Sequence, residues 1–310
     1  MVIACTFHSP RSESLRLSRR DYTHYIEVAM SDYWEPRHEA HAIEIVGAAV
    51  AFGDILSDVQ IRKALRTADA VSKNFGLLER NPVTGVSFKI EGGLVSPSET
   101  GPTNGMAFRR TIMEENHSGN TVPVAADELV VDRQRIVFRT RRYIRWAQFH
   151  DAMATLLQPL LDGLLGSISV QSVRLEYRDR FTYTGESNAA PAELLLRKGS
   201  PLIAQHVFAL TSPWHSHTGM FEPSPGVQRR LIQIEIAATD VKRGNTLKRS
   251  IGIMTGAQDN FAASEETDQE ALQILGRLPD LHSRSKNLLR AIITPEVAVK
   301  IGLTSAERPQ

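Results

Sequence analysis

The stretch HAIEIVGAAVAF at residues 41–52, together with the helix start that follows it, decides the fold class. Its β-branched and small apolar residues predict a buried strand. Residues 57–60, SDVQ, then have the S-x-x-Q form of a capping box, in which the serine and glutamine side chains satisfy backbone amides of a first helical turn. A strand followed at once by a well-marked helix predicts a protein of mixed α and β structure.

The spacing of apolar residues extends this helix over 58–75. Apolar side chains recur every three or four positions and form one stripe, and Gly76 can take the left-handed conformation that ends a helix. The stripe consists of Ile61, Ala64, Leu65, Ala68 and Val71. We expect Ile61 and Leu65 to lie in the core.

Strand-like runs follow, separated by segments rich in Gly, Pro, Ser, Asn and Thr, and such connections favour antiparallel pairing. We predict strands at 22–30, 85–92, 106–114 and 128–140 and a second helix at 145–165. The apolar stripe of that second helix includes Leu157 and Leu161.

The same order of elements returns in the second half. We predict a strand at 167–183, a short helix near 190–198, strands at 202–217 and 229–239, a helix from Leu278 that buries Leu288 and Leu289, and a last short helix from Thr294. The expected fold is therefore α+β, with two similar modules of antiparallel sheet and packed helices at 21–166 and 167–310 and possible internal duplication. The polar segment 241–277 fits this scheme least, and we expect it to be a mobile insertion.

The composition limits the classes of function. Among 310 residues, 42% are hydrophobic and 23% are charged, and the net charge of +1 gives no excess for non-specific binding to nucleic acid. The single cysteine, Cys5, excludes an internal disulfide and a thiolate metal cage, which fits a cytoplasmic protein. Serine and arginine dominate residues 1–20, so we expect a mobile arm there. No apolar run approaches the length of a membrane span.

Three blocks carry a resemblance: RIVFRTRRYIRWAQF at 135–149, VRLEYRDRF at 173–181 and LPDLHSRSKNLLRAIITPE at 278–296. Together they resemble a sporadically distributed bacterial family of uncharacterised proteins of about this length. The positions that match the family's pattern are Leu175, Tyr177, Arg180, Leu281, His282, Ile293 and Thr294. The chain departs from it at Glu176, Arg178 and Asp179, where the family tends to have Arg, Ile and Asn. The resemblance implies no reaction, but it implies an accessory gene of the horizontally transferred or antiviral defence-linked kind.

A basic segment with aromatic neighbours is the sharpest hint of a binding site. It comprises Arg133, Arg135, Arg139, Arg141, Arg142, Tyr143 and Arg145, with Trp146 beside it. Arginines can bind phosphates while aromatic rings stack on bases. In an extended strand, however, several of these arginines share one face and Ile136 and Phe138 share the other, so a solvated or ion-paired face explains the same spacing. Binding of an anionic partner requires that the arginines lie in solvent without carboxylate partners.

The alternation in VRLEYRDRFTY at 173–183 directs a carboxylate toward the core, because Asp179 shares its parity with Tyr177 and Phe181. A buried charge needs a partner. We therefore predict Asp179 and Arg180 as buried polar residues and expect Asp179 to pair with an arginine or with backbone amides. A functional carboxylate with a perturbed pKa is the alternative.

Other motifs of chemistry are weak. His215 and His217 share one face of a predicted strand, which suits zinc when a third ligand approaches from another element, and His206 and His282 are available. No third ligand follows from the sequence, so we expect no metal and no other cofactor. The signatures of serine hydrolases, phosphate-binding loops and dinucleotide folds are missing.

These observations predict a non-catalytic recognition or assembly protein that binds a protein partner, in a bacterial defence-linked or mobile-element operon. Self-association is compatible with this interpretation. The first alternative is nucleic-acid binding through the arginine-rich strand and turn. The second is a metal-assisted hydrolase that uses His215 and His217.

Overall fold

A computed structural model describes residues 32–84, 88–91, 94–97, 103–115, 120–262 and 270–303. The mobile arm predicted at 1–20 and the strand predicted at 22–30 lie outside these residues, as does part of the strand predicted at 85–92. Trp34–Gln310 forms one structural unit, which contains all the described helices and strands.

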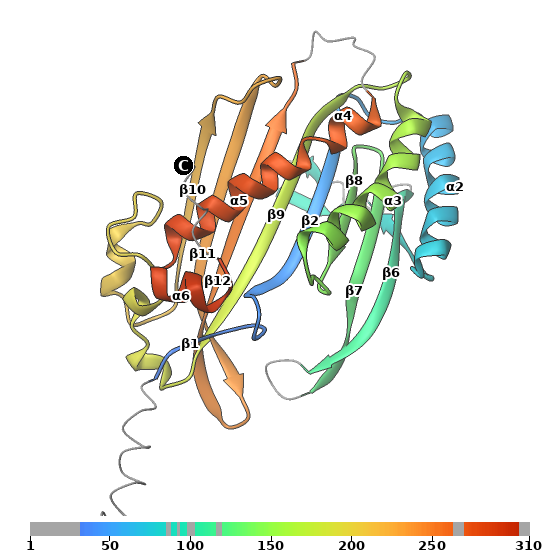
Figure 1. Cartoon of the computed structure of the whole chain (residues 1–310). Coiled ribbons are helices and arrows are strands. Elements are labelled where there is room, and N and C mark those ends of the chain that lie inside the picture. Colours follow the sequence, from blue (N-terminus) through green and yellow to red (C-terminus); the bar gives the residue numbers. More distant parts are fainter. Residues whose placement is uncertain are drawn as a thin grey trace, which may run out of the picture. The chain divides into compact units, whose positions relative to one another are not determined.

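A ten-stranded antiparallel sheet forms the framework of this unit (Figure 1). Its strands are β1 (Trp34–Pro36), β2 (Ile43–Phe52), β3 (Glu79–Thr84), β6 (Thr103–Glu115), β7 (Thr121–Asp132), β8 (Arg135–Thr140), β9 (Val170–Tyr183), β10 (Trp214–Glu222), β11 (Arg229–Arg243) and β12 (Thr246–Asn260). Their order is β10-β11-β12-β9-β2-β8-β7-β6-β3, and β1 also pairs with β9. A separate hairpin joins β4 (Phe88–Glu91) to β5 (Leu94–Pro97). The mixed α and β class is confirmed.

Strands β2 and β9 pair at the centre of the sheet and join its two halves. Outward from β2 lie β8, β7 and β6, and outward from β9 lie β12, β11 and β10. Apart from β1, the first strand of each half pairs with its last strand and the middle strands follow in reverse order; the first half has one more strand, β3, at its outer edge. The predicted modules at 21–166 and 167–310 share this order, but they do not have separate sheets, because β9 pairs with strands of both halves.

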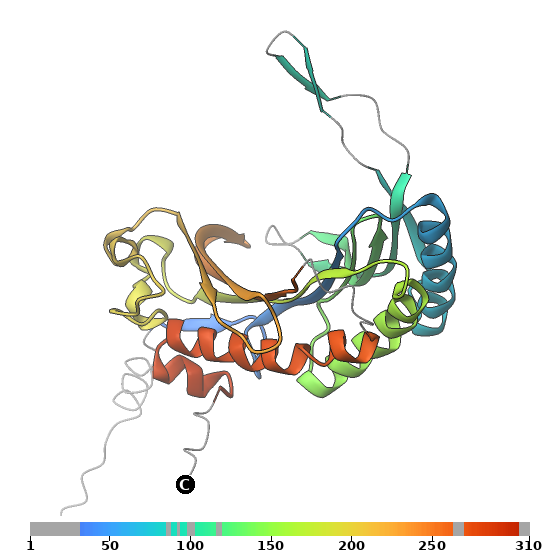
Figure 2. The same ribbon diagram turned by 90° about the horizontal axis from the view of Figure 1, so that it is seen from above.

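The long helices cover one face of the sheet (Figure 2). They are α2 (Asp58–Phe75), α3 (Trp146–Leu164) and α5 (Leu278–Ile292), and the short helices α4 (Ala271–Leu275) and α6 (Pro295–Lys300) flank α5. Helices α2 and α3 pack together beside β6, β7 and β8, whereas α5 packs on β9 and β12. Apolar side chains of β2 fill the layer between sheet and helices, because Val46, Ala48 and Val50 alternate onto that face and are buried.

The structure confirms the predicted ends of α2 and most of the predicted core residues. The Ser57 hydroxyl accepts a hydrogen bond from the Gln60 amide, the Gln60 side chain accepts one from the Ser57 amide at 2.8 Å, and Gly76 ends α2 with a φ of 83°. Five of the six residues predicted for the core are buried, and Leu65 is partly buried: Ile61, Leu157, Leu161, Leu288 and Leu289 are the buried ones.

Several predicted elements differ from the structure. The single strand expected at 128–140 is a hairpin, because the Asp132 carboxylate accepts hydrogen bonds from the Gln134 and Arg135 amides and closes a tight turn. The strand expected at 202–217 begins only at Trp214 and follows the 3₁₀ helix η3 (Gln205–Ala209). The short helix expected near 190–198 is the single turn η2 (Ala192–Leu194).

The prediction of a mobile insertion at 241–277 is wrong for most of that segment. Strand β12 occupies the middle of it and lies directly beside β9. Ile251, Ile253 and Ala257 are spaced two or four apart on one side of the strand and are buried, whereas glycine and polar residues occupy most of the other positions and give the sequence its polar character. Residues 263–269 lie outside the described part of the chain.

Candidate ligand-binding site

Five of the six arginines of the basic segment are paired with carboxylates, so these five do not form the unpaired surface that binding of an anion requires; Arg145 is the exception among the described residues. The ion pairs are Arg133–Asp58, Arg135–Asp132 at 3.3 Å, Arg139–Glu128 at 2.6 Å, Arg141–Glu44 at 3.8 Å and Arg142–Asp127 at 3.1 Å. The physical reason is the register of the hairpin, which places Glu128 directly opposite Arg139. Ile136 and Phe138 are buried behind this face, so the alternation itself is confirmed.

The two histidines proposed for zinc, His215 and His217, are exposed on one face of the edge strand β10. Within the described ranges, no three His, Cys, Asp or Glu side chains come together as a metal site. Nor does any helix among these residues have the length and apolar character needed to cross a membrane.

A cavity of about 710 Å³ lies where the two halves of the sheet meet, and we call it the central cavity. The first half contributes the turn at 40–43 and the start of α3 at 143–147. The second half contributes residues of β9, β12 and α5 and the segment 301–303 after α6. Cavities between two halves of a fold and of this size are typical of small-molecule sites.

The carboxyl group of Asp179 is the most unusual group in the lining of this cavity. Asp179 is 2% exposed, and neither of its carboxylate oxygens has a hydrogen-bond partner among the described residues. Burial raises the pKa of this carboxyl to about 7. The expected pairing with an arginine or backbone amides is wrong, because Arg180 points to the opposite face of β9 and donates to Glu44 at 2.8 Å.

Two buried hydroxyl groups of the lining share this property. Neither Thr255 Oγ1 nor Ser285 Oγ has a hydrogen-bond partner within the described part of the structure. Thr255 lies across from Tyr177 in the β9·β12 register, one pair away along the same face from Asp179, whose partner in the register is Ile253. Buried polar atoms in native proteins are nearly always bonded. Three such groups, on β9, β12 and α5, gather around this one cavity.

Hydrogen-bonded aromatic side chains form a wall of the cavity. The Tyr177 hydroxyl lies 2.8 Å from His282 Nδ1, and the hydroxyl groups of Tyr143 and Tyr177 also interact. Burial lowers the pKa of His282 to about 4, with Lys286 adding to the shift, so the ring is neutral at pH 7 and Nδ1 shares a hydrogen bond with the Tyr177 hydroxyl. Burial also raises the pKa of Tyr143 to about 12, with Asp179 contributing, which keeps its hydroxyl protonated.

The indole ring of Trp146 stacks on the ring of His282, with centroids 4.2 Å apart and an angle of 2° between the planes. Trp146 is the first residue of α3, and His282 lies on α5. This contact therefore joins helices of the two halves above the central strands. Arg145 and Lys286 line the same cavity from these two helices and are exposed, so they mark its mouth.

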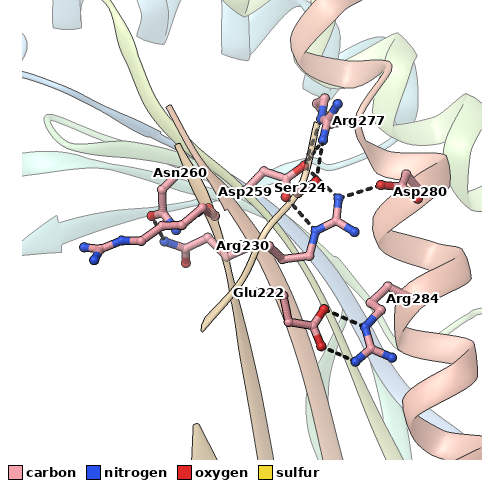
Figure 3. Close-up of polar contacts among 10 residues, drawn as sticks. Glu222, Ser224, Arg230, Asp259, Asn260, Arg277, Asp280 and Arg284 are labelled. Atoms are coloured by element: carbon pink, nitrogen blue, oxygen red, sulfur yellow. Dashed lines mark hydrogen bonds and ion pairs between the residues drawn. The ribbon is translucent and has the colours of Figure 1, made fainter. Parts of the chain in front are cut away.

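An ion-pair network on the other side of α5 holds this helix against the sheet (Figure 3). The buried carboxylate of Asp259, on β12, accepts hydrogen bonds from Arg230 at 2.7 Å and from Arg277 at 2.8 Å. Arg230 also contacts Asp280 in the first turn of α5, and a bidentate pair joins Arg284 to Glu222 farther along. The network fixes the position of α5, and therefore that of the cavity residues on its opposite side.

Sequence reasoning found only part of this site. The parity of β9 predicted that Asp179 points to the core, and Arg145 was included in the basic segment. His282 was considered as an available zinc ligand and as a position that matches the family's pattern, but not as part of a cavity. Thr255 and Ser285 gave no signal, because hydroxyl residues are common on every surface. The one available signal was the combination of an aromatic residue and an acid at spacing two, Tyr177 and Asp179, on an otherwise apolar strand face.

Comparisons with known proteins add no assignment. Neither the models of protein families nor the curated proteins contain a match to this chain.

Proposed function

We propose that the chain is a non-catalytic recognition protein that binds a small organic molecule in the central cavity. The observation that supports this proposal is the set of unpartnered buried polar groups in the lining of a cavity of about 710 Å³: Asp179, Thr255, Ser285 and the Nδ1 atom of His41. An unbonded buried polar group costs roughly 1–3 kcal/mol. Several such groups around one cavity therefore carry a cost in stability, and a bound ligand would remove this cost by supplying the missing hydrogen bonds.

The expected biological setting stays a prediction from the resemblance described above. A protein partner, self-association and a defence-linked operon are compatible with a ligand-binding protein, because occupation of a cavity between two halves can change the surface that a partner contacts. We also propose that the two halves arose by internal duplication, which the common strand order of β2-β8-β7-β6 and β9-β12-β11-β10 supports. A cytoplasmic location is part of the same proposal.

The nucleic-acid alternative receives no support from the arginine-rich segment, whose guanidinium groups are largely engaged by carboxylates. The metal-assisted hydrolase alternative lacks a third ligand for His215 and His217 in the described ranges.

A cavity-blocking variant tests the proposal. Ala147 is exposed in the first turn of α3 and lines the cavity, so Ala147→Trp should narrow the mouth without entering the core. Gln148→Trp is a matched control, since Gln148 is exposed on the same turn and does not line the cavity. The proteins would be equilibrated with a low-molecular-weight cell extract, washed and measured by native mass spectrometry and thermal shift.

Wild type and Gln148→Trp should retain a small molecule and gain thermal stability with it, whereas Ala147→Trp should retain much less. Ligand binding to the folded state alone stabilises it by about 2.7 kcal/mol at one hundred times the Kd. Equal retention by all three proteins, or no retention by wild type, would contradict a role for the central cavity.

A further inference from the structure

The mouth of the central cavity has the properties of an anion site. Arg145 and Lys286 line it, are exposed, and have no ion-pair partner within the described part of the chain. Helix α3 begins here, and its N-cap residue, Arg145, makes no side-chain hydrogen bond to the first turn. The unbonded amides of a helix N-terminus carry partial positive charge and bind anions such as phosphate. Two cationic side chains and these amides therefore favour a negatively charged group.

The middle of the cavity is aromatic. Tyr143, Trp146 and His282 line it, and Trp146 and His282 lie parallel to one another. Aromatic surfaces favour flat ligands, because rings stack or meet edge to face. His282 is held neutral by burial, so it adds no positive charge to this layer at pH 7.

The floor provides hydrogen-bond acceptors without partners. Asp179 is almost fully buried, lines the cavity, and leaves both carboxylate oxygens unbonded. Thr255 and Ser285 add hydroxyl groups that can donate and accept. A ligand group that satisfies this floor must contain N–H or O–H donors, and a ring edge with adjacent donors and acceptors would use the carboxyl and both hydroxyls.

We propose that the ligand of the central cavity, whose binding is the function proposed above, is an aromatic anion of the nucleotide type. Its ring carries N–H donors and reaches toward Asp179, its flat faces contact Tyr143 and Trp146, and its phosphate lies beside Arg145, Lys286 and the start of α3. The volume of about 710 Å³ suits a molecule of this size. The cations at the mouth would face the phosphate, and the aromatic residues in the middle would face the flat ring. The acceptors of the floor would face the edge of that ring.

Three probes separate the contributions of ring and phosphate: guanosine 5′-monophosphate, guanosine and ribose 5-phosphate. Each would be titrated calorimetrically into wild type, Lys286→Gln and Asp179→Asn. The control is Lys198→Gln, because Lys198 is exposed and does not line the cavity. The titrations would be repeated at higher salt, since an exposed charge contact weakens with ionic strength.

Guanosine monophosphate should bind wild type and the control equally. Lys286→Gln should weaken its binding about fivefold at low salt, while the weaker binding of guanosine stays unchanged. Asp179→Asn should weaken nucleotide and nucleoside alike by about tenfold, because the buried acceptor for ring N–H groups is altered. Ribose 5-phosphate should bind worst, since it lacks the ring.

Equal affinity of wild type and Lys286→Gln for the nucleotide would overturn the anion site, and ribose 5-phosphate binding as tightly as the nucleotide would overturn the aromatic site. If none of the probes binds, but wild type retains a small molecule that Ala147→Trp does not, the ligand class is wrong and the proposed function survives. If neither experiment shows binding, both fail together. Should Asp179→Asn not fold, Lys286→Gln, an exposed change, still decides the outcome.

Discussion

Replacing Asp179 by asparagine should increase the stability of the protein above neutral pH, although it should weaken ligand binding. Burial raises the pKa of this carboxyl from its ordinary value near 3.8 to about 7. Between these two values the unfolded chain has lost the proton while the folded protein keeps it. The free energy of unfolding therefore falls as the pH rises from about 4 to about 7.

The magnitude follows from the size of the shift. About three pKa units at about 1.36 kcal/mol each give about 4 kcal/mol, which is an upper limit because a buried site relaxes and admits water. Asparagine cannot ionise, so the variant lacks this loss. The difference in unfolding free energy between Asp179→Asn and wild type should thus grow with pH up to neutrality and then stay constant.

His282 acts in the opposite direction, and the comparison of the two proteins cancels its effect. Its pKa is lowered to about 4, so the unfolded chain binds a proton first as the pH falls below about 6.5. That change costs stability at acidic pH in wild type and variant alike. The stability of wild type alone therefore varies less with pH than either group would cause by itself.

Urea denaturation at pH 4, 5.5, 7 and 8, followed by tryptophan fluorescence, measures these free energies. The exposed residue Asp162, on the far side of α3 from the sheet, provides the control Asp162→Asn, which should parallel wild type at every pH. Parallel curves for Asp179→Asn and wild type would mean that Asp179 ionises as an ordinary carboxyl, and the reasoning about the floor of the cavity would then be wrong.

Three further changes test the framework by thermal or urea denaturation. Arg139→Glu places a carboxylate opposite Glu128 and should destabilise the protein by about 1 kcal/mol, whereas no change would mean that the ion pair is unimportant. Asp259→Ala leaves the buried Arg230 without its main partner and should cost about 3–5 kcal/mol, so a loss below about 1 kcal/mol would contradict the network shown in Figure 3. Leu161→Ala removes a fully buried side chain and should cost about 2–5 kcal/mol, and a near-neutral effect would contradict the packing of α3.

The sequence predicted elements whose signals are local. The capping box and Gly76 gave both ends of α2, and the parity of β9 gave the direction of Asp179, because each depends only on neighbouring residues. The prediction failed where spatial partners decide. The sequence predicted that the region of β12 is an insertion. In the structure, β12 is an internal strand that pairs with β9 on one side and with β11 on the other.

The central cavity could not be predicted from the sequence, because its lining also depends on contacts between distant segments. Its lining runs from Ala40 to Leu303, and the orientation of α5 on the sheet brings these segments together. For the basic segment, the sequence suggested a binding surface that the structure does not support. Its arginines are close together in the sequence, whereas some of their carboxylate partners, such as Glu44 and Asp58, are distant in the sequence. The carboxylate partner of an arginine on a sheet is fixed by strand order, which short patterns do not contain.

The pairing of β2 with β9 has a consequence for how the chain is made. The ribosome releases β2 long before β9, because α2, α3 and strands β3 to β8 come between them. During that time the strand IEIVGAAVAF has an unpaired edge, and such edges promote aggregation. Moreover, Asp179 lies on β9 itself, so no fragment that ends before β9 contains the floor of the cavity. Synthesis of β9 therefore has two effects: it covers the unpaired edge of β2, and it adds Asp179 to the cavity.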